Sequence, residues 1–138
     1  MARSIEFEHS RARGLAVVRE LLRAMRPKDW IKNVFVFAAI AFAQDPVLGI
    51  PLWQEPRKLL IVVGAFVLFC MVASSIYLIN DLADIEKDRA HPKKRNRPLA
   101  SGKLSPTLAK IAAVVLLAIG LPLSFAIDIV DVGPLHTA

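Results

Sequence analysis

Three stretches of the chain are apolar enough to be read as membrane-crossing helices. The longest, 59–79, has 21 residues without a single charge. As a helix it would be about 31 Å long, close to the thickness of a bilayer's hydrocarbon core. Two shorter runs, 34–43 and 111–127, reach a workable length when their flanks are included and flanking lysines extend to the headgroups. The pattern predicts an all-α, multi-pass transmembrane helix bundle with spans at about 27–43, 59–79 and 108–127.

The segment before the first span, 1–26, is also predicted to be helical. Leu15, Val18, Leu22 and Met25 recur at helical spacing, and arginines lie on a neighbouring face. We interpret this segment as a basic amphipathic helix at the membrane surface. A solvated basic tail is the alternative.

Charge orients the predicted spans. The net charge is +6, and eight of the 18 Lys and Arg residues lie in 1–33 and eight more in 80–110, against two in 44–58. By the positive-inside rule, the N-terminus and the loop at 80–110 are cytoplasmic, as expected for a protein of the bacterial inner membrane. The excess of basic residues is explained by the cytoplasmic location of these segments and by their attraction to anionic lipids, so no nucleic-acid partner is predicted. The single cysteine, Cys70, excludes a disulfide framework.

An acidic motif follows the second predicted span. If that helix continues, Asp81, Asp84 and Asp88 share one face and Asn80 joins its edge. A divalent cation would relieve the repulsion between these carboxylates, and hard oxygen ligands suit Mg²⁺ or Mn²⁺. Magnesium usually completes its shell with substrate phosphate, so a diphosphate substrate is predicted. A solvated acidic helix end is the alternative.

A basic loop comes next, within the segment 80–107 that separates the last two spans. Pro92, Pro98 and Gly102 interrupt any helix there. An acidic motif that binds a metal ion and a basic loop beside it are complementary parts of a phosphate-binding site. For Lys93 and Lys94 a role as topology markers is an equal alternative, whereas Arg95 and Arg97 are better placed because the flanking prolines fix the backbone. His91 could serve as a base, but a turn residue is the favoured interpretation. The candidate phosphate-binding residues are Lys93, Lys94, Arg95 and Arg97.

These residues resemble a known family. The pattern Asn80-Asp81-x-x-Asp84-x-x-x-Asp88, followed by Arg97-Pro98-Leu99-x-x-Gly102, resembles the first aspartate-rich motif of the UbiA-type intramembrane prenyltransferase superfamily. Two further segments, Arg-Pro-Lys-Asp-Trp-Ile-Lys-Asn at 26–33 and His-Pro-x-Lys-Arg-x-Arg-Pro at 91–98, resemble its phosphoribosyl-transferring subgroup. The similarity covers about 22–105, so 27–138 is interpreted as part of such a transmembrane domain.

The resemblance implies a reaction and a set of site residues. The subgroup transfers 5-phosphoribose from phosphoribosyl diphosphate to a polyprenyl (decaprenyl) phosphate, a step that feeds cell-wall biosynthesis. The residues matching Asp81, Asp84 and Asp88, with Asn80 beside them, would hold Mg²⁺ on the diphosphate and act in catalysis. Lys32 and Asn33 are candidates for contacting a substrate phosphate or ribose; extension to the membrane interface is their alternative.

The chain also departs from this family, whose members are longer and carry a second polar motif on a later cytoplasmic loop. We therefore interpret it as an N-terminal part or a truncated product, and expect it to be inactive alone. Two other functions stay open: an aromatic prenyltransferase that uses a prenyl diphosphate, and a small non-catalytic membrane protein. Homo-oligomerisation and the length of the carrier lipid are not specified by the sequence.

Overall fold

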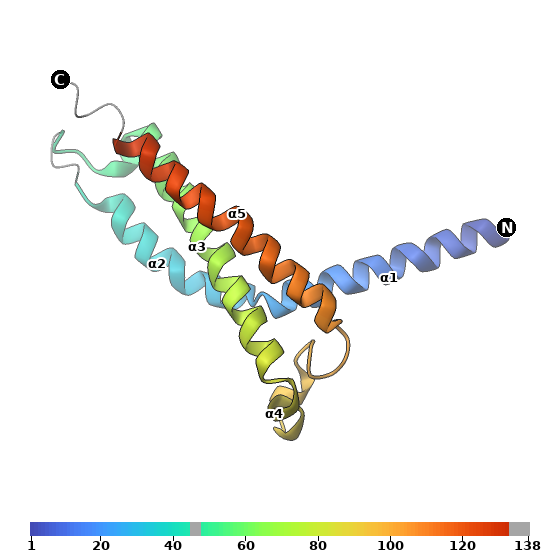
Figure 1. Ribbon diagram of the computed structural model, residues 1–138. Coiled ribbons are helices and arrows are strands. Elements are labelled where there is room, and N and C mark those ends of the chain that lie inside the picture. The colour runs from blue at the N-terminus through green and yellow to red at the C-terminus, as the bar shows by residue number, and fades with distance from the viewer. Residues whose placement is uncertain (45–47, 133–138) are drawn as a thin grey trace. The chain divides into compact units, whose positions relative to one another are not determined.

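The computed structural model describes the backbone of residues 1–44 and 48–132, and helices dominate these ranges (Figure 1). Apart from one isolated bridge between Gln44 and Pro51, the described residues form no β-structure. The prediction of an all-α chain is confirmed. The elements in chain order are α1 (Ala2–Ala24), α2 (Pro27–Phe42), the 3₁₀ turn η1 (Leu52–Gln54), α3 (Pro56–Ala83), α4 (Ile85–Ala90), the 3₁₀ turn η2 (Lys94–Asn96) and α5 (Pro106–Val132).

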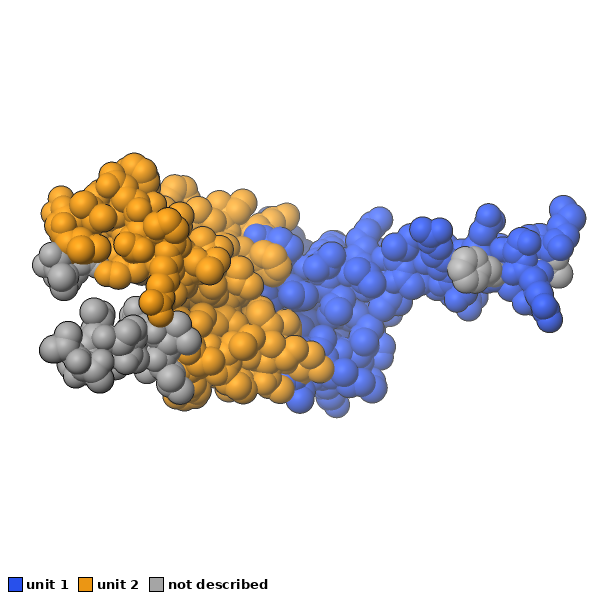
Figure 2. All heavy atoms as spheres, turned by 90° about the horizontal axis from the view of Figure 1, so that it is seen from above, with its two compact units in different colours: residues 1–27, 74–114 blue, residues 28–73, 115–138 orange. Residues whose placement is uncertain are grey.

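The chain divides into two compact units, coloured separately in Figure 2. Unit 1 comprises 1–27 and 74–114, and unit 2 comprises 28–73 and 115–138. The end of α3 and the start of α5 therefore belong to unit 1, together with α1, α4 and η2. Unit 1 holds the acidic motif and the basic loop, whereas unit 2 holds most of the apolar helix surface.

Within the part of the chain that the structure describes, two helices have the length and composition of membrane spans. These are α3 and the part of α5 at Pro106–Ile127, and only 22% and 11% of their most apolar windows are buried inside the protein. The core helix of a soluble protein would be mostly covered, so such exposed apolar surface suits lipid. Helix α2 has 16 residues, about 24 Å, and falls short of the same length criterion. A third span at 27–43 thus stays a prediction.

Proline determines where the three long apolar helices begin. Pro27, Pro56 and Pro106 are the first residues of α2, α3 and α5. A proline at this position costs the helix no hydrogen bond, because the first N–H groups of a helix have no acceptor within it. Helix α3 continues past the predicted span 59–79 as far as Ala83, and so carries the first residues of the acidic motif.

Helix α1 matches the predicted helical segment at 1–26. Leu15, Val18 and Leu22 are 63%, 54% and 46% exposed, whereas Met25 is half-buried. The apolar side chains of α1 are thus available to a lipid surface, and its location at the membrane stays a prediction.

In unit 2 a glycine lets α3 and α5 approach closely. A Cβ atom built on Gly120 would lie 3.3 Å from Cγ2 of Val72. Small residues at such crossings allow helix backbones to pack in membranes. At Gly14 of α1, by contrast, a Cβ would meet nothing within 4 Å.

We therefore expect Gly120→Val to lower the free energy of unfolding by about 1–3 kcal/mol, because the added carbons overpack the contact with Val72. The same change at Gly14 meets open space and should leave stability within about 0.5 kcal/mol. Thermal unfolding in detergent, followed by circular dichroism, compares the two variants. Equal stability of both would contradict the close packing at Gly120.

Candidate functional site

Two buried carboxylates and two arginines form an ion-pair network in unit 1. Asp81, near the end of α3, and Asp88, on α4, are only 3% and 2% exposed. Nη1 of Arg97 donates to Oδ1 of Asp81 at 3.2 Å and to Oδ2 of Asp88 at 3.0 Å. Nη2 of Arg26 donates to the same Asp81 Oδ1 at 2.7 Å. The two negative charges are thus matched by two positive ones, as burial requires.

The helix carrying the acidic motif is interrupted, so the continuous helix on which the shared face of the three aspartates was conditional does not form. Helix α3 ends at Ala83, and Asp84, with φ −102° and ψ 13°, precedes α4. Asp84 stands at the N-terminal cap position of α4, but its side chain makes no capping hydrogen bond. Repulsion between like charges along the motif disfavours continuous winding.

Backbone hydrogen bonds nevertheless carry the helical repeat across the break. The N–H of Asp84 donates to Asn80 at 3.0 Å, and that of Asp88 donates to Asp84 at 2.7 Å. Asp81 and Asp88 therefore stay on one side and share Arg97. Asp84 is half-buried and Asn80 exposed, and no described contact joins either side chain to the ion-pair network.

Arg26 is a member of this network that sequence reasoning did not place in the site. It connects α1 to α2 with φ +55°, a left-handed backbone that costs a non-glycine residue about 1 kcal/mol or more. Its guanidinium lies 5.0 Å from the centroid of the Tyr77 ring, and Ser74 Oγ donates to the Met25 carbonyl at 3.3 Å. The signal for Arg26 in the sequence was its place at the head of the 26–33 motif, directly before Pro27.

The segment after Arg97 is packed firmly enough to fix that side chain. Leu99 and Leu104 are 2% and 1% exposed. The N–H of Ser101 donates to the Arg97 carbonyl at 2.8 Å, and Gly102 closes the turn with φ +78°, which favours glycine. The predicted interruption of the helix here is confirmed, although 80–107 also contains α4 and η2.

The other predicted loop cations lie outside the ion-pair network. Lys93, Lys94 and Arg95 are exposed, and no described contact joins their side chains to the two buried aspartates. Nδ1 of His91 accepts hydrogen bonds from the backbone N–H of Lys93 at 3.2 Å and of Lys94 at 3.3 Å. The imidazole therefore shapes a turn, as the sequence favoured.

Lys32 and Asn33 belong to unit 2, on α2. Nζ of Lys32 lies 3.0 Å from Oδ1 of Asp29 in an exposed pair, and Asn33 Nδ2 lies 3.9 Å from Sγ of Cys70. Their proposed contact with substrate stays a prediction.

The acidic motif has the donor atoms of a magnesium site but not its arrangement. Carboxylate and amide oxygens are the ligands that Mg²⁺ and Mn²⁺ take. Among the described residues, however, no three acidic, histidine or cysteine side chains are grouped so that they could hold an ion. Arg97 and Arg26 lie against the oxygens of Asp81 and Asp88. In this arrangement the residues do not fit a metal ion.

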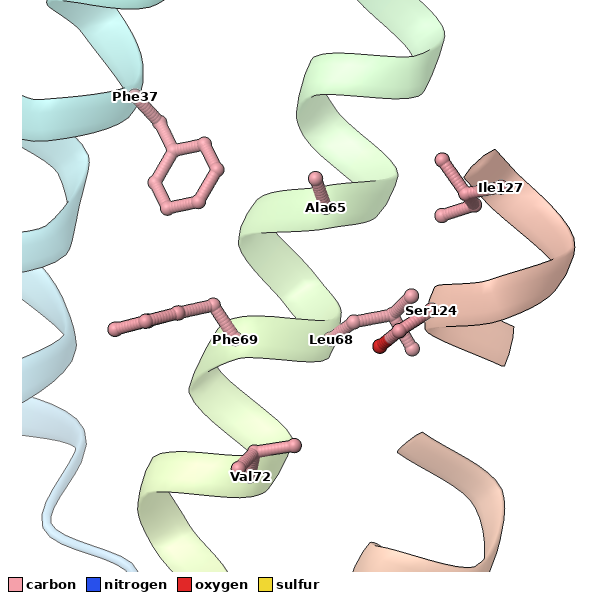
Figure 3. Close-up of a pocket in the computed structure, with 7 residues that line it drawn as sticks. All are labelled: Phe37, Ala65, Leu68, Phe69, Val72, Ser124 and Ile127. Atoms are coloured by element: carbon pink, nitrogen blue, oxygen red, sulfur yellow. The ribbon is translucent and has the colours of Figure 1, made fainter. Parts of the chain in front are cut away.

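Unit 2 contains an apolar hollow of about 290 Å³ among α2, α3 and α5 (Figure 3). Phe37 of α2 points toward Phe69 of α3, with ring centroids 6.0 Å apart. The hydroxyl of Ser124 donates to the Gly120 carbonyl at 2.7 Å. Because the hydrogen bond of this hydroxyl is made within its own helix, the lining of the hollow is suited to a hydrocarbon. The lining residues are Phe37, Ala65, Leu68, Phe69, Val72, Ser124 and Ile127.

Known proteins resemble this chain over most of its length. The model of the UbiA prenyltransferase family matches residues 33–133. A decaprenyl-phosphate phosphoribosyltransferase of Corynebacterium glutamicum is 45% identical over 76% of this chain and 30% of the relative. One of Mycolicibacterium smegmatis is 42% identical over 79% and 33%. A digeranylgeranylglyceryl phosphate synthase of Sulfurisphaera tokodaii is 36% identical over 76% and 37%. The chain thus spans about a third of the length of these curated relatives.

Proposed function

The chain belongs to the UbiA prenyltransferase family, and from that premise we propose that it supplies part of a site that transfers 5-phosphoribose to a polyprenyl phosphate such as decaprenyl phosphate. The donor is phosphoribosyl diphosphate. The bond between ribose C1 and the diphosphate oxygen breaks, a bond from C1 to an oxygen of the lipid phosphate forms, and diphosphate leaves. The names of the Corynebacterium and Mycolicibacterium relatives support this choice of substrates.

The observation that carries the proposal is the ion-pair network of Arg26, Asp81, Asp88 and Arg97. As C1 loses its bond, negative charge grows on the diphosphate, and fixed cations stabilise that charge. An arginine fork can take two phosphate oxygens at once. The side chain of Arg97 is 28% exposed, so a phosphate can reach it.

The rest of the reaction needs no strong base, because the lipid phosphate that attacks C1 is already an anion. This agrees with the use of His91 Nδ1 in a turn. In this proposal the isoprenoid chain of the lipid binds in the apolar hollow of unit 2. The transfer of an apolar chain from water to an apolar surface is favourable.

A direct test compares two diphosphates. We expect the chain in lipid nanodiscs with Mg²⁺ to bind phosphoribosyl diphosphate at least about tenfold more tightly than geranyl diphosphate, because a site built for a polar ribose phosphate rejects an apolar analogue. Calorimetric titration of both ligands measures the ratio. Tighter binding of geranyl diphosphate would indicate a prenyl-diphosphate-dependent transferase instead, and binding of neither would indicate a non-catalytic membrane protein.

We also propose an orientation in the bacterial inner membrane, with the N-terminus and 80–110 in the cytoplasm. The charge asymmetry supports it. In a Cys70→Ser background, a thiol introduced by Lys103→Cys should react with an impermeant reagent only after the membrane is opened. A thiol introduced by Gln54→Cys should react in intact spheroplasts. The reverse pattern would contradict the orientation.

A further inference from the structure

We infer that Arg89 is a positioning residue: from α4 it holds the turn that follows Arg97, and so it sets the direction in which the Arg97 guanidinium meets the diphosphate. Arg89 is not a member of the ion-pair network, and sequence reasoning gave it no role. The inference rests on the proposed function and adds to it a residue that acts through Arg97 rather than on the substrate.

The guanidinium of Arg89 makes two contacts of different kinds. Nε donates to the carbonyl of Ala100 at 3.0 Å, and Nη1 lies 2.9 Å from Oε1 of Glu86. The side chain of Glu86 belongs to the same helix and is 86% exposed, so that ion pair contributes little. Ala100 is only 6% exposed and belongs to the turn after Arg97. The hydrogen bond to Ala100 is therefore the contact that joins α4 to another segment.

A single peptide unit connects Arg89 to Arg97. Its carbonyl, that of Ala100, accepts the hydrogen bond from Arg89, and its N–H, that of Ser101, donates to the Arg97 carbonyl at 2.8 Å. Hydrogen bonds in such a chain polarise and strengthen one another. Loss of Arg89 would take a donor from a carbonyl in a buried part of the turn and weaken the next hydrogen bond. The backbone of Arg97 would then be held less firmly.

Helix α4 thus holds Arg97 at two points through consecutive residues. The Asp88 carboxylate accepts a hydrogen bond from the Arg97 side chain at 3.0 Å, and Arg89 holds its backbone through the peptide unit. One point of attachment leaves a long side chain free to turn about it, whereas two points fix its direction. Arginine binds phosphate through a planar fork, so its direction matters more than that of a point charge.

The first measurement is the affinity of the full 138-residue chain in lipid nanodiscs for phosphoribosyl diphosphate, by calorimetric titration. We expect Arg89→Gln to bind it about tenfold more weakly than the wild type, because Arg97 is no longer held at two points. Lys87→Gln is the matched control: it removes the same charge from an exposed side chain of the same helix and should change the affinity less than about twofold. Equal affinities of the two variants would overturn the inference.

A change at Arg97 separates positioning from a general loosening of unit 1. Arg97→Lys keeps the charge, so binding stays measurable, but it lacks the planar fork that Arg89 directs. In an Arg97→Lys background, Arg89→Gln should therefore weaken binding less than about twofold. A purely structural role for Arg89 would weaken binding by the same factor in both backgrounds, and that result would also overturn the inference.

Amide hydrogen exchange reports on the turn without any ligand. The Ser101 amide should exchange at least about threefold faster in Arg89→Gln than in Lys87→Gln, because its peptide unit has lost the donor at the carbonyl. Equal exchange in the two variants would overturn the inference and leave the proposed function standing. Failure of the proposed function would appear separately, as the absence of a preference for phosphoribosyl diphosphate over geranyl diphosphate in the wild type.

Discussion

Asp81→Asn is expected to abolish Mg²⁺-dependent binding of phosphoribosyl diphosphate and to lower the free energy of unfolding by about 3–5 kcal/mol, the usual cost of breaking a buried ion pair by removing one partner. Oδ1 of Asp81 accepts hydrogen bonds from both Arg26 and Arg97, and the residue is 3% exposed. Without the charge of Asp81, Arg26 loses its ion pair and Arg97 keeps only the one with Asp88. Thermal unfolding in detergent and calorimetric titration measure the two effects.

Asp84→Asn separates binding from stability. Asp84 lies in the same motif, but it is half-buried, and no described contact joins it to the ion-pair network. The sequence predicts that Asp84 belongs to a motif that holds Mg²⁺, and on that prediction Asp84→Asn loses Mg²⁺-dependent binding as well. The free energy of unfolding should change by less than about 1 kcal/mol. Retained binding in either variant would contradict the role given to these aspartates, and equal destabilisation by both would contradict the network.

Most of the fold follows from local signals in the sequence. The uncharged run at 59–79 lies within a long helix, and Pro27 and Pro106 each begin one. Both signals can be read from a short segment alone, without knowledge of what packs against it. The sequence left open whether the helix of the second span continues into the acidic motif, and α3 does continue as far as Ala83. The sequence could not show that Arg26 and Arg97 pair with the charged Asp81 near its end.

The site was predictable only in part. Helical spacing correctly put Asp81 and Asp88 on one side, but it also put Asp84 with them, and spacing along a helix says nothing of a break between its turns. The pairing of Arg26 with Asp81 joins residues 55 positions apart, which a single sequence does not reveal. Among the loop cations, packing of Leu99 and Leu104 behind Arg97 selects that residue over its exposed neighbours, and packing is decided by tertiary structure.

The second large effect concerns Arg26. Arg26→Gln should lower the free energy of unfolding by about 1–3 kcal/mol, less than Asp81→Asn, because the side chain of Arg26 is 29% exposed and its charge is partly screened. The contact with the Tyr77 ring adds to the loss. Arg26→Lys keeps the charge but not the planar fork, so it should recover only part of the stability. Thermal unfolding of the three proteins under identical conditions gives the order.

Arg26→Gly then tests the backbone. Glycine loses the guanidinium just as glutamine does, but it adopts φ +55° without the penalty that any other side chain incurs there. The gain is offset by glycine's greater freedom in the unfolded chain, so Arg26→Gly should be at least as stable as Arg26→Gln rather than far more stable. If the unfolding temperature of Arg26→Gly were well below that of Arg26→Gln, the left-handed backbone would not be a constraint at this junction. The ion pair with Asp81 would then not be needed to compensate a strained backbone at Arg26.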